Sequence, residues 1–215
     1  IWRAADEGSV AWLKVYRFGE LTESQWNDAV RTILLRQGAA DFEGIVLDLR
    51  NNPGGFLTGS VFLASEFLED GVVVQQQGKY QTQTFSVERN GRLIGTPLVV
   101  LVNKGSASAS EIVAGALRDR LGVKLVGETT FGKGTVQDAE DLRDGAGIHI
   151  TTGRWLLPSG EWISEEGIKP DVEVALEATG AAQTESDVPV EEELSEEDGR
   201  KDAQLEKAIE VLKAR

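Results

Sequence analysis

Short, continuous apolar runs alternate with segments whose apolar residues recur at helical spacing over most of the chain. Glu43–Arg50 is largely apolar up to its polar carboxyl end, which is typical of a strand buried in a parallel sheet. In Thr22–Gln37 the apolar residues fall every three or four positions, which predicts an amphipathic helix. The predicted strands are Ser9–Phe18, Glu43–Arg50, Leu98–Val102 and Lys124–Val126, and the predicted helices are Thr22–Gln37, Ser60–Leu68 and Glu111–Arg120. This order predicts an α/β core of mainly parallel strands, whose ligands bind beyond the carboxyl ends of the strands.

After residue 135 the pattern changes to hairpins. His149–Leu157 predicts a strand, and Gly167–Val174 predicts a short extended edge. The stretch 177–202 is acidic and poor in aromatic residues, which predicts a linker or loosely held arm. Apolar residues recur at helical spacing again in the last segment, 203–215. The predicted organisation is therefore a core at 1–176, the acidic arm, and a terminal helix at 203–215.

Length and composition narrow the classes of protein. With 215 residues and 40% hydrophobic content, the chain can bury one substantial core. No apolar run is long enough to span a membrane. A net charge of -14 argues against a nucleic-acid partner, because phosphate binding needs clustered Lys and Arg. The chain opens with Ile1 and contains no Met, so we expect a mature or excised piece of a longer protein.

The residue inventory excludes several kinds of catalytic chemistry. The chain has no Cys, which rules out a thiol nucleophile and Cys/His zinc clusters, and no run of carboxylates has the spacing of a calcium loop. The single histidine, His149, lies in an alternating stretch and is interpreted as a polar residue on a strand. We therefore predict neither a metal nor a cofactor. A serine nucleophile paired with a lysine base remains.

Two short segments supply such a pair. Gly105–Glu111 carries three serines among small residues at the start of a predicted helix, where unpaired backbone N–H groups could hold an oxyanion. Lys133 lies between two glycines, so its amine is open to close approach. A lysine must be neutral to accept a proton. We expect the apolar neighbours Phe131 and Val136 to desolvate the amine and keep it neutral.

Three segments in order resemble the signature blocks of the carboxyl-terminal processing, or tail-specific, serine proteases. They are Ile45–Gly55, Gly105–Glu111 and Gly127–Gln137, and the similarity runs from about Ser9 to Val174. The resemblance implies a ClpP/crotonase-like fold. It also implies a serine endopeptidase that cuts protein or peptide substrates near exposed carboxyl termini.

The resemblance also implies a role for individual residues. Ser108, the middle serine, is the nucleophile, and Lys133, 25 residues later, is the general base. Gln137 is similar to the residue that orients the lysine amine. The amide of Ala109 and one amide of the Gly54–Gly55 turn bind the oxyanion, and which glycine donates is left open. Asp119 matches an acidic position that we interpret as structural.

The chain departs from the family pattern in one respect. Family members usually carry a PDZ domain that captures substrate tails, and Ile1–Gly38 is too short to form one. Either this domain lies upstream and is missing here or this member works without it, and the missing initiator Met favours the first. The resemblance implies an extracytoplasmic location and leaves the oligomeric state open, a homo-oligomer included. Two other functions stay open: a catalytically silent module that binds a peptide or an apolar ligand, and a crotonase-type enzyme acting on CoA thioesters.

Overall fold

A six-stranded sheet forms the centre of the computed structural model, which describes residues 2–5, 9–36, 39, 41–141, 146–163, 166–175 and 202–215. Its strands, in spatial order, are β1 (Trp2–Ala5), β2 (Val10–Lys14), β3 (Gly44–Asp48), β6 (Leu98–Val102), β7 (Lys124–Gly127) and β10 (Val172–Glu173). Only β1 is antiparallel to its neighbour. The predicted α/β core of mainly parallel strands is therefore confirmed.

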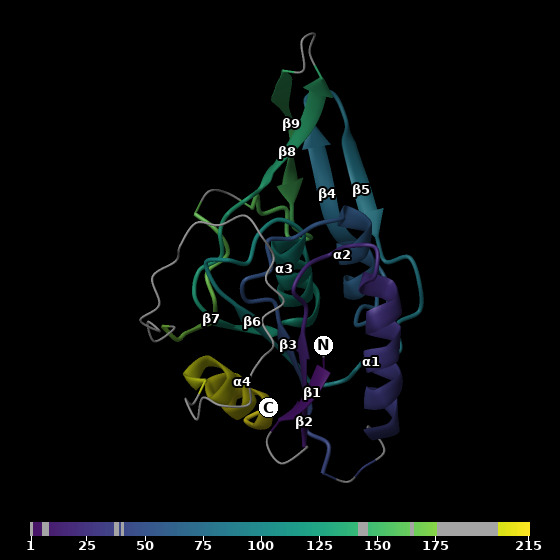
Figure 1. Cartoon of the computed structure of the whole chain (residues 1–215), viewed down its shortest axis with the longest axis vertical. Coiled ribbons are helices and arrows are strands. Elements are labelled where there is room, and N and C mark those ends of the chain that lie inside the picture. Colours follow the sequence, from purple (N-terminus) through teal and green to yellow (C-terminus); the bar gives the residue numbers. More distant parts are fainter. Residues whose placement is uncertain are drawn as a thin grey trace.

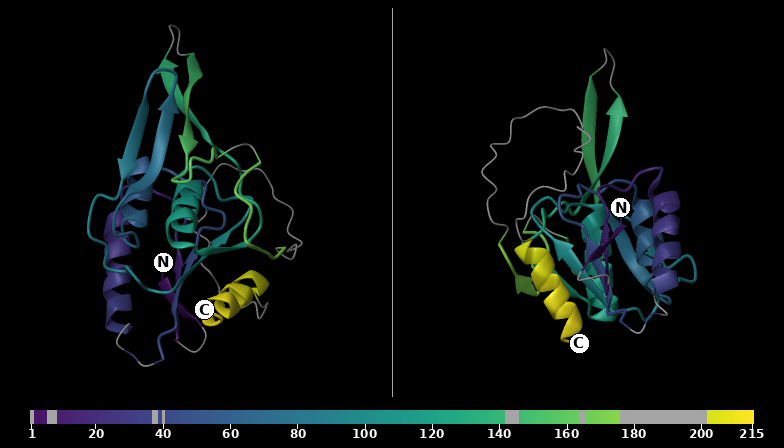
Figure 2. Two further views of the ribbon diagram at one scale, coloured as in Figure 1. Left: turned by 180° about the vertical axis from the view of Figure 1, so that it is seen from behind. Right: turned by 60° about the horizontal axis from the view of Figure 1, so that its bottom comes forward.

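Helices cover both faces of this sheet (Figure 1). On one face lie α1 (Thr22–Arg36), α2 (Leu57–Ala64) and α3 (Ala109–Leu121), packed over the side chains of alternate strand residues such as Ile45 and Leu47. On the opposite face α4 (Ala203–Lys213) covers the intervening residues, such as Val46 (Figure 2). The central strands β3 and β6 are fully buried, as their continuous apolar sequences predict.

A second, antiparallel sheet projects away from the core (Figure 1). Its strands, in spatial order, are β5 (Thr82–Ser86), β4 (Val72–Gly78), β9 (Gly147–Leu156) and β8 (Thr135–Asp141). Trp155 is buried on its inner face and makes an edge-to-face contact with Phe85 at 6.4 Å between ring centroids. The hairpins predicted after residue 135 are confirmed by β8 and β9, whereas β1, β4 and β5 were not predicted.

Several boundaries differ from the prediction. The helix expected at Ser60–Leu68 spans 57–64 instead, because tighter turn hydrogen bonds from the amides of Glu66 and Phe67 take over beyond it. Helix α3 begins two residues early, directly after Ser108. The predicted terminal helix is confirmed by α4. The acidic arm, apart from Asp202, lies outside the described residues.

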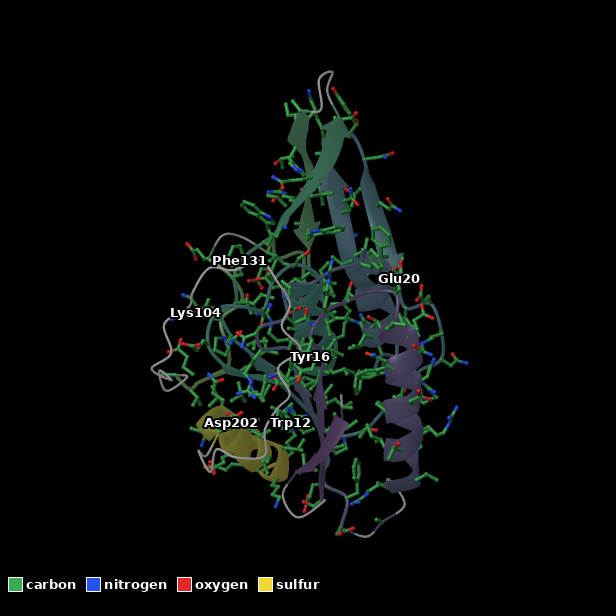
Figure 3. The ribbon with its side chains drawn as sticks, viewed as in Figure 1. Trp12, Tyr16, Glu20, Lys104, Phe131 and Asp202 are labelled. Atoms are coloured by element: carbon green, nitrogen blue, oxygen red, sulfur yellow. The ribbon has the colours of Figure 1, made fainter. Side chains whose placement is uncertain are left out.

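A cluster of charged groups fixes the start of α4 against the sheet. Arg50, which follows β3, forms paired hydrogen bonds with Asp48 and with Asp202 at 2.7 to 2.9 Å. Asp202 also accepts a hydrogen bond from the Leu205 amide and so caps the helix. Asp202 and Trp12 lie beside α4 in Figure 3, and the Trp12 indole donates to Asp48. The N-terminus of α4 is therefore held by the residue that leads into the Asn51–Gly55 loop.

Candidate active site

The candidate site lies where two loops meet beyond the carboxyl ends of β3 and β6. These strands are parallel neighbours, so the loops that follow them leave the sheet at the same edge. The Asn51 amide donates to Asn103 Oδ1 at 2.9 Å, and Asn103 Nδ2 donates to Asn51 Oδ1 at 2.8 Å. The Ala107 amide donates to the Asn52 carbonyl at 3.0 Å. These bonds hold the glycine turn and the serine segment together.

The three serines of the segment have different surroundings. Ser106 is fully buried and its hydroxyl donates to the Leu49 carbonyl at 2.8 Å. Ser110 is also fully buried and donates to the Asn52 carbonyl at 2.9 Å. Both hydroxyls therefore join the two loops. Ser108 alone of the three is partly exposed to solvent, where a substrate could reach it.

The backbone of Ser108 is strained. Its φ is 55° and its ψ is −114°, a combination that side chains with a Cβ rarely adopt. Asn51, in the facing loop, is the other non-glycine residue with positive φ among the described residues. Such strain tends to collect at functional sites, where the surrounding structure holds it in place.

Gly54 brings the glycine turn into direct contact with the nucleophile loop. It has φ of 99°, and a Cβ there would lie 2.7 Å from the Ala107 carbonyl oxygen and 2.9 Å from the Ser108 Cβ. Only glycine fits at this distance, so the turn and the Ser108 backbone are packed against one another.

One backbone amide in the serine segment and one in the glycine turn are available to a ligand. In the part of the chain that the structure describes, neither the Ala109 nor the Gly55 N–H has a hydrogen-bond partner. The Gly54 N–H, by contrast, donates to Asn52 Oδ1 at 2.9 Å. The geometry therefore favours Gly55 over Gly54 as the donor that the sequence left undecided.

A buried carboxylate connects the serine loop (residues 103–108) to the lysine loop (residues 128–134). Glu111, in the first turn of α3, is fully buried, and one of its oxygens accepts the Ser108 amide at 2.8 Å and the Lys133 amide at 2.9 Å. The other oxygen accepts the Gly132 amide at 2.7 Å and the Thr130 hydroxyl at 2.5 Å. Sequence reasoning missed this role. The Ser-x-x-Glu spacing of a helix capping box was the signal that could have revealed it.

The other side of the lysine loop is held by two tryptophans. The Gly134 carbonyl accepts the Trp155 amide at 2.9 Å and the Trp162 indole N–H at 3.1 Å. A Cβ on Gly134 would overlap the carbonyl oxygen of Ile163, so glycine is required there. The backbone of the loop is thus fixed from both sides.

The lysine side chain itself is exposed. Lys133 and Gln137 both face solvent, and the Phe131 side chain is 62% exposed at the surface (Figure 3). The prediction that Phe131 and Val136 bury the Lys133 amine is therefore wrong for this chain by itself. Gln137 lies on β8 opposite Thr151, next to a register shift in the pairing of β8 with β9.

Two further residues from the sequence analysis lie in structural positions. His149 is an exposed residue of β9, as predicted from its alternating stretch. Asp119 lies near the far end of α3, where its carboxylate accepts the Ser159 amide at 3.0 Å and pairs with Arg118. Asp119 therefore ties the turn after β9 to α3.

Known proteins share this sequence and fold. Residues 9–174 match the model of peptidase family S41. The carboxy-terminal processing protease CtpA of Bacillus subtilis is 39% identical over 79% of this chain, and the carboxyl-terminal-processing protease of Synechocystis is 40% identical over 76%. The solved photosystem II D1 C-terminal processing protease superimposes on 80% of the chain with a TM-score of 0.70 and 37% identity.

The match covers only part of each relative. The chain spans 36% and 37% of the length of the two bacterial proteases and 45% of the solved structure. None of the described helices is long and apolar enough to cross a membrane. The family match covers most of this chain, includes the serine and lysine loops, and agrees with the ClpP/crotonase-like fold, so the chain belongs to peptidase family S41.

Proposed function

We propose that this chain is the catalytic core of a serine endopeptidase that cuts protein substrates near their carboxyl termini. The observation that carries the proposal is the shared anchor of Ser108 and Lys133, whose amides donate to the same Glu111 oxygen. One rigid group therefore sets the positions of the candidate nucleophile and the candidate base. Family membership supports the same reaction.

The proposed reaction has two steps. The Ser108 hydroxyl attacks the peptide carbonyl while neutral Lys133 takes its proton, and the ammonium then protonates the leaving amine as the C–N bond breaks. Water attacks the resulting ester, Lys133 takes the water proton, and the proton returns to Ser108 when the acid product leaves. The N–H groups of Ala109 and Gly55 stabilise the negative charge on the carbonyl oxygen in both steps.

Gln137 serves as a hydrogen-bond acceptor for the lysine amine in this proposal. A neutral amide can orient the amine without adding a charge that would favour the ammonium form. Because Lys133 is exposed in the chain alone, we propose that the bound peptide supplies the cover that keeps the amine neutral. An upstream PDZ domain and an extracytoplasmic location stay predictions.

Matched single substitutions test the assignment of the nucleophile and base. Ser108→Ala and Lys133→Arg should each lower peptide hydrolysis on the order of 10³-fold or more, since guanidinium cannot act as a base. Ser106→Ala is the control, because its hydroxyl serves the buried loop contact and not the reaction. Near-normal turnover in Ser108→Ala would show that the nucleophile is wrongly assigned.

A serine-directed active-site probe separates the enzyme from the other two functions. The proposed protease should be labelled at Ser108, and labelling should be lost in Ser108→Ala. A silent binding module or a crotonase-type thioester enzyme would not be labelled there. Absence of labelling and of hydrolysis in the folded chain would exclude the protease proposal.

A further inference from the structure

A positively charged pocket borders the candidate active site on the antiparallel sheet. It has a volume of about 350 Å³ and opens widely to solvent. Its lining includes Lys79 and Arg154 and no acidic residue, in a chain that carries 36 acidic and 22 basic residues. The pocket should therefore attract an anionic group, although the net negative charge of the whole chain repels it.

The pocket is continuous with the segments that carry the candidate base and its partner. Thr135 lines the pocket and follows the Lys133–Gly134 dipeptide directly. Thr151 lines it as well and is the cross-strand partner of Gln137. A peptide that reaches Lys133 can therefore extend into this pocket without leaving the surface.

Arg154 is held in an orientation suited to an anion. It lies in register with Gln77 on one side and Thr135 on the other, so the three side chains share one face of the sheet. Its Nε donates to Gln77 Oε1 at 2.7 Å, and its guanidinium carbon lies 5.5 Å from the centre of the Trp162 ring. Among the described residues, Arg154 has no carboxylate partner. Its terminal nitrogens are the natural donors to a carboxylate.

Trp162 connects this arginine to the catalytic loop. Its indole N–H donates to the Gly134 carbonyl, next to Lys133, while its ring faces Arg154. Arg154 and the backbone next to Lys133 therefore contact the same tryptophan.

From this arrangement we propose that Arg154, with Lys79 and Gln77, forms a subsite for a carboxylate group of the peptide substrate. This inference rests on the proposed protease function, because the ligand is the substrate of that reaction. The carboxylate has two sources in a peptide: an acidic side chain or the terminal carboxyl group. Both have the same chemistry at the pocket, and matched peptides distinguish them.

Binding and hydrolysis are measured on four labelled versions of one peptide, with Glu or Gln in the chain and with a free or amidated carboxyl terminus. Binding uses fluorescence anisotropy with the full chain carrying Ser108→Ala, and hydrolysis uses the unmodified chain. One acidic version should bind about tenfold more tightly than its neutral counterpart, and high salt should reduce the difference. If replacing Glu with Gln weakens binding, the source of the carboxylate is the side chain. If amidation weakens binding, the source is the terminal carboxyl group.

Arg154→Gln should remove the preference for the acidic peptide over its neutral counterpart. Arg31→Gln makes the same change of charge at a highly exposed position on α1 and should alter nothing. Equal binding of acidic and neutral peptides, a preference that survives in Arg154→Gln, or no binding of any peptide would overturn the subsite.

The two proposals fail separately. Charge-dependent binding that needs Arg154, without hydrolysis by the unmodified chain, would refute the protease function and support the pocket. Hydrolysis that depends on Ser108 but shows no charge preference would support the protease and refute the pocket.

Discussion

At the scale of single residues, Glu111 is buried with no basic side chain paired to it among the described residues. Its charge is instead met by three backbone N–H groups and the Thr130 hydroxyl, at 2.5 to 2.9 Å, and by the N-terminal end of the α3 dipole. A buried ion is stable only with such a full set of donors. The same bonds order the backbones of the candidate nucleophile and the candidate base.

Glu111→Gln should disturb both the site and the fold. Whichever oxygen the NH2 group of the amide replaces, at least one backbone N–H loses its acceptor and faces another donor. We expect a loss of about 2–4 kcal/mol in the free energy of unfolding and at least a tenfold fall in kcat/KM. Thr130→Val removes one of the four donors to Glu111, together with the acceptor of the Ile168 amide, and should lower kcat/KM less than Glu111→Gln does. Unchanged kcat/KM in a folded Glu111→Gln chain would contradict the positioning role.

Gly54→Ala tests the close approach of the glycine turn to Ser108. The added methyl group would lie within 3.0 Å of the Ala107 carbonyl oxygen, the Ser108 Cβ and the Ala109 nitrogen, in a conformation that also strains any residue with a Cβ. Activity should fall sharply because the turn must move away from the nucleophile. Gly95→Ala is the control, since Gly95 has a φ of 77° with nothing within 4 Å of its added Cβ. Equal losses of activity in the two variants would show that backbone strain alone, and not the contact with Ser108, explains the result.

At the scale of elements, local pattern predicted the parallel core and the β8–β9 part of the antiparallel sheet, but it missed β4 and β5. The strands β3 and β6 are buried on both faces, so their sequences are continuously apolar. Strand β4 carries the polar run Gln75–Gln77, because much of the second sheet is exposed. Arg154, the cross-strand partner of Gln77, lies 77 residues away in the chain. A polar strand that is paired over such a distance leaves little local signal.

The candidate site was predictable to a similar extent. Ser108, Lys133 and the glycine turn belong to short motifs with fixed spacing, and the structure brings their backbones together. The exposure of Lys133 was not predictable, because it depends on where Phe131 points and not on how apolar it is. The roles of Trp162 and Arg154 depend on cross-strand register, which spacing along the chain does not reveal.

Asp202 helps to join the start of α4 to the sheet, and Asp202→Ala tests that connection. The substitution removes the N-cap bond to Leu205 and the paired bonds to Arg50. We expect a loss of about 2 kcal/mol in the free energy of unfolding, from the cap and a partly exposed charged bond together. Glu210→Ala removes a carboxylate from the exposed side of the same helix and should cost about 0.5 kcal/mol or less. Equal costs in denaturant unfolding would show that the Asp202 bonds contribute nothing specific.

At the scale of the whole molecule, buried carboxylates connect distant parts of the fold and make it sensitive to acid. Glu66 joins α1 to the loop after β5, because it accepts the Trp26 indole at 2.8 Å and hydrogen bonds from Arg92 and Arg89. Burial alone would raise the pKa of Glu66, but these hydrogen bonds and charges hold it below its ordinary value. The pKa of Asp202 is lowered against burial in the same way by Arg50.

The direction of these shifts gives the sign of the pH dependence. A carboxylate whose pKa is lower in the folded than in the unfolded chain stabilises the fold at pH values above the unfolded pKa, about 4.3 for Glu. That stabilisation is lost as the pH falls through the lower, folded pKa. The free energy of unfolding should therefore be level near neutral pH and should decline below about pH 4.

Glu66→Gln should lower and flatten this profile. At neutral pH the variant loses the charged bonds to both arginines, and we expect a cost of about 2–4 kcal/mol, because Glu66 is fully buried whereas the arginines are partly exposed. In acid the difference should shrink, since the unmodified chain then carries a protonated Glu66 as well. Thermal unfolding measured at a series of pH values, with the exposed Glu69→Gln as the control, checks both effects. A constant difference between Glu66→Gln and the unmodified chain at every pH would mean that the carboxylate acts through shape alone, because only a charge can be titrated away.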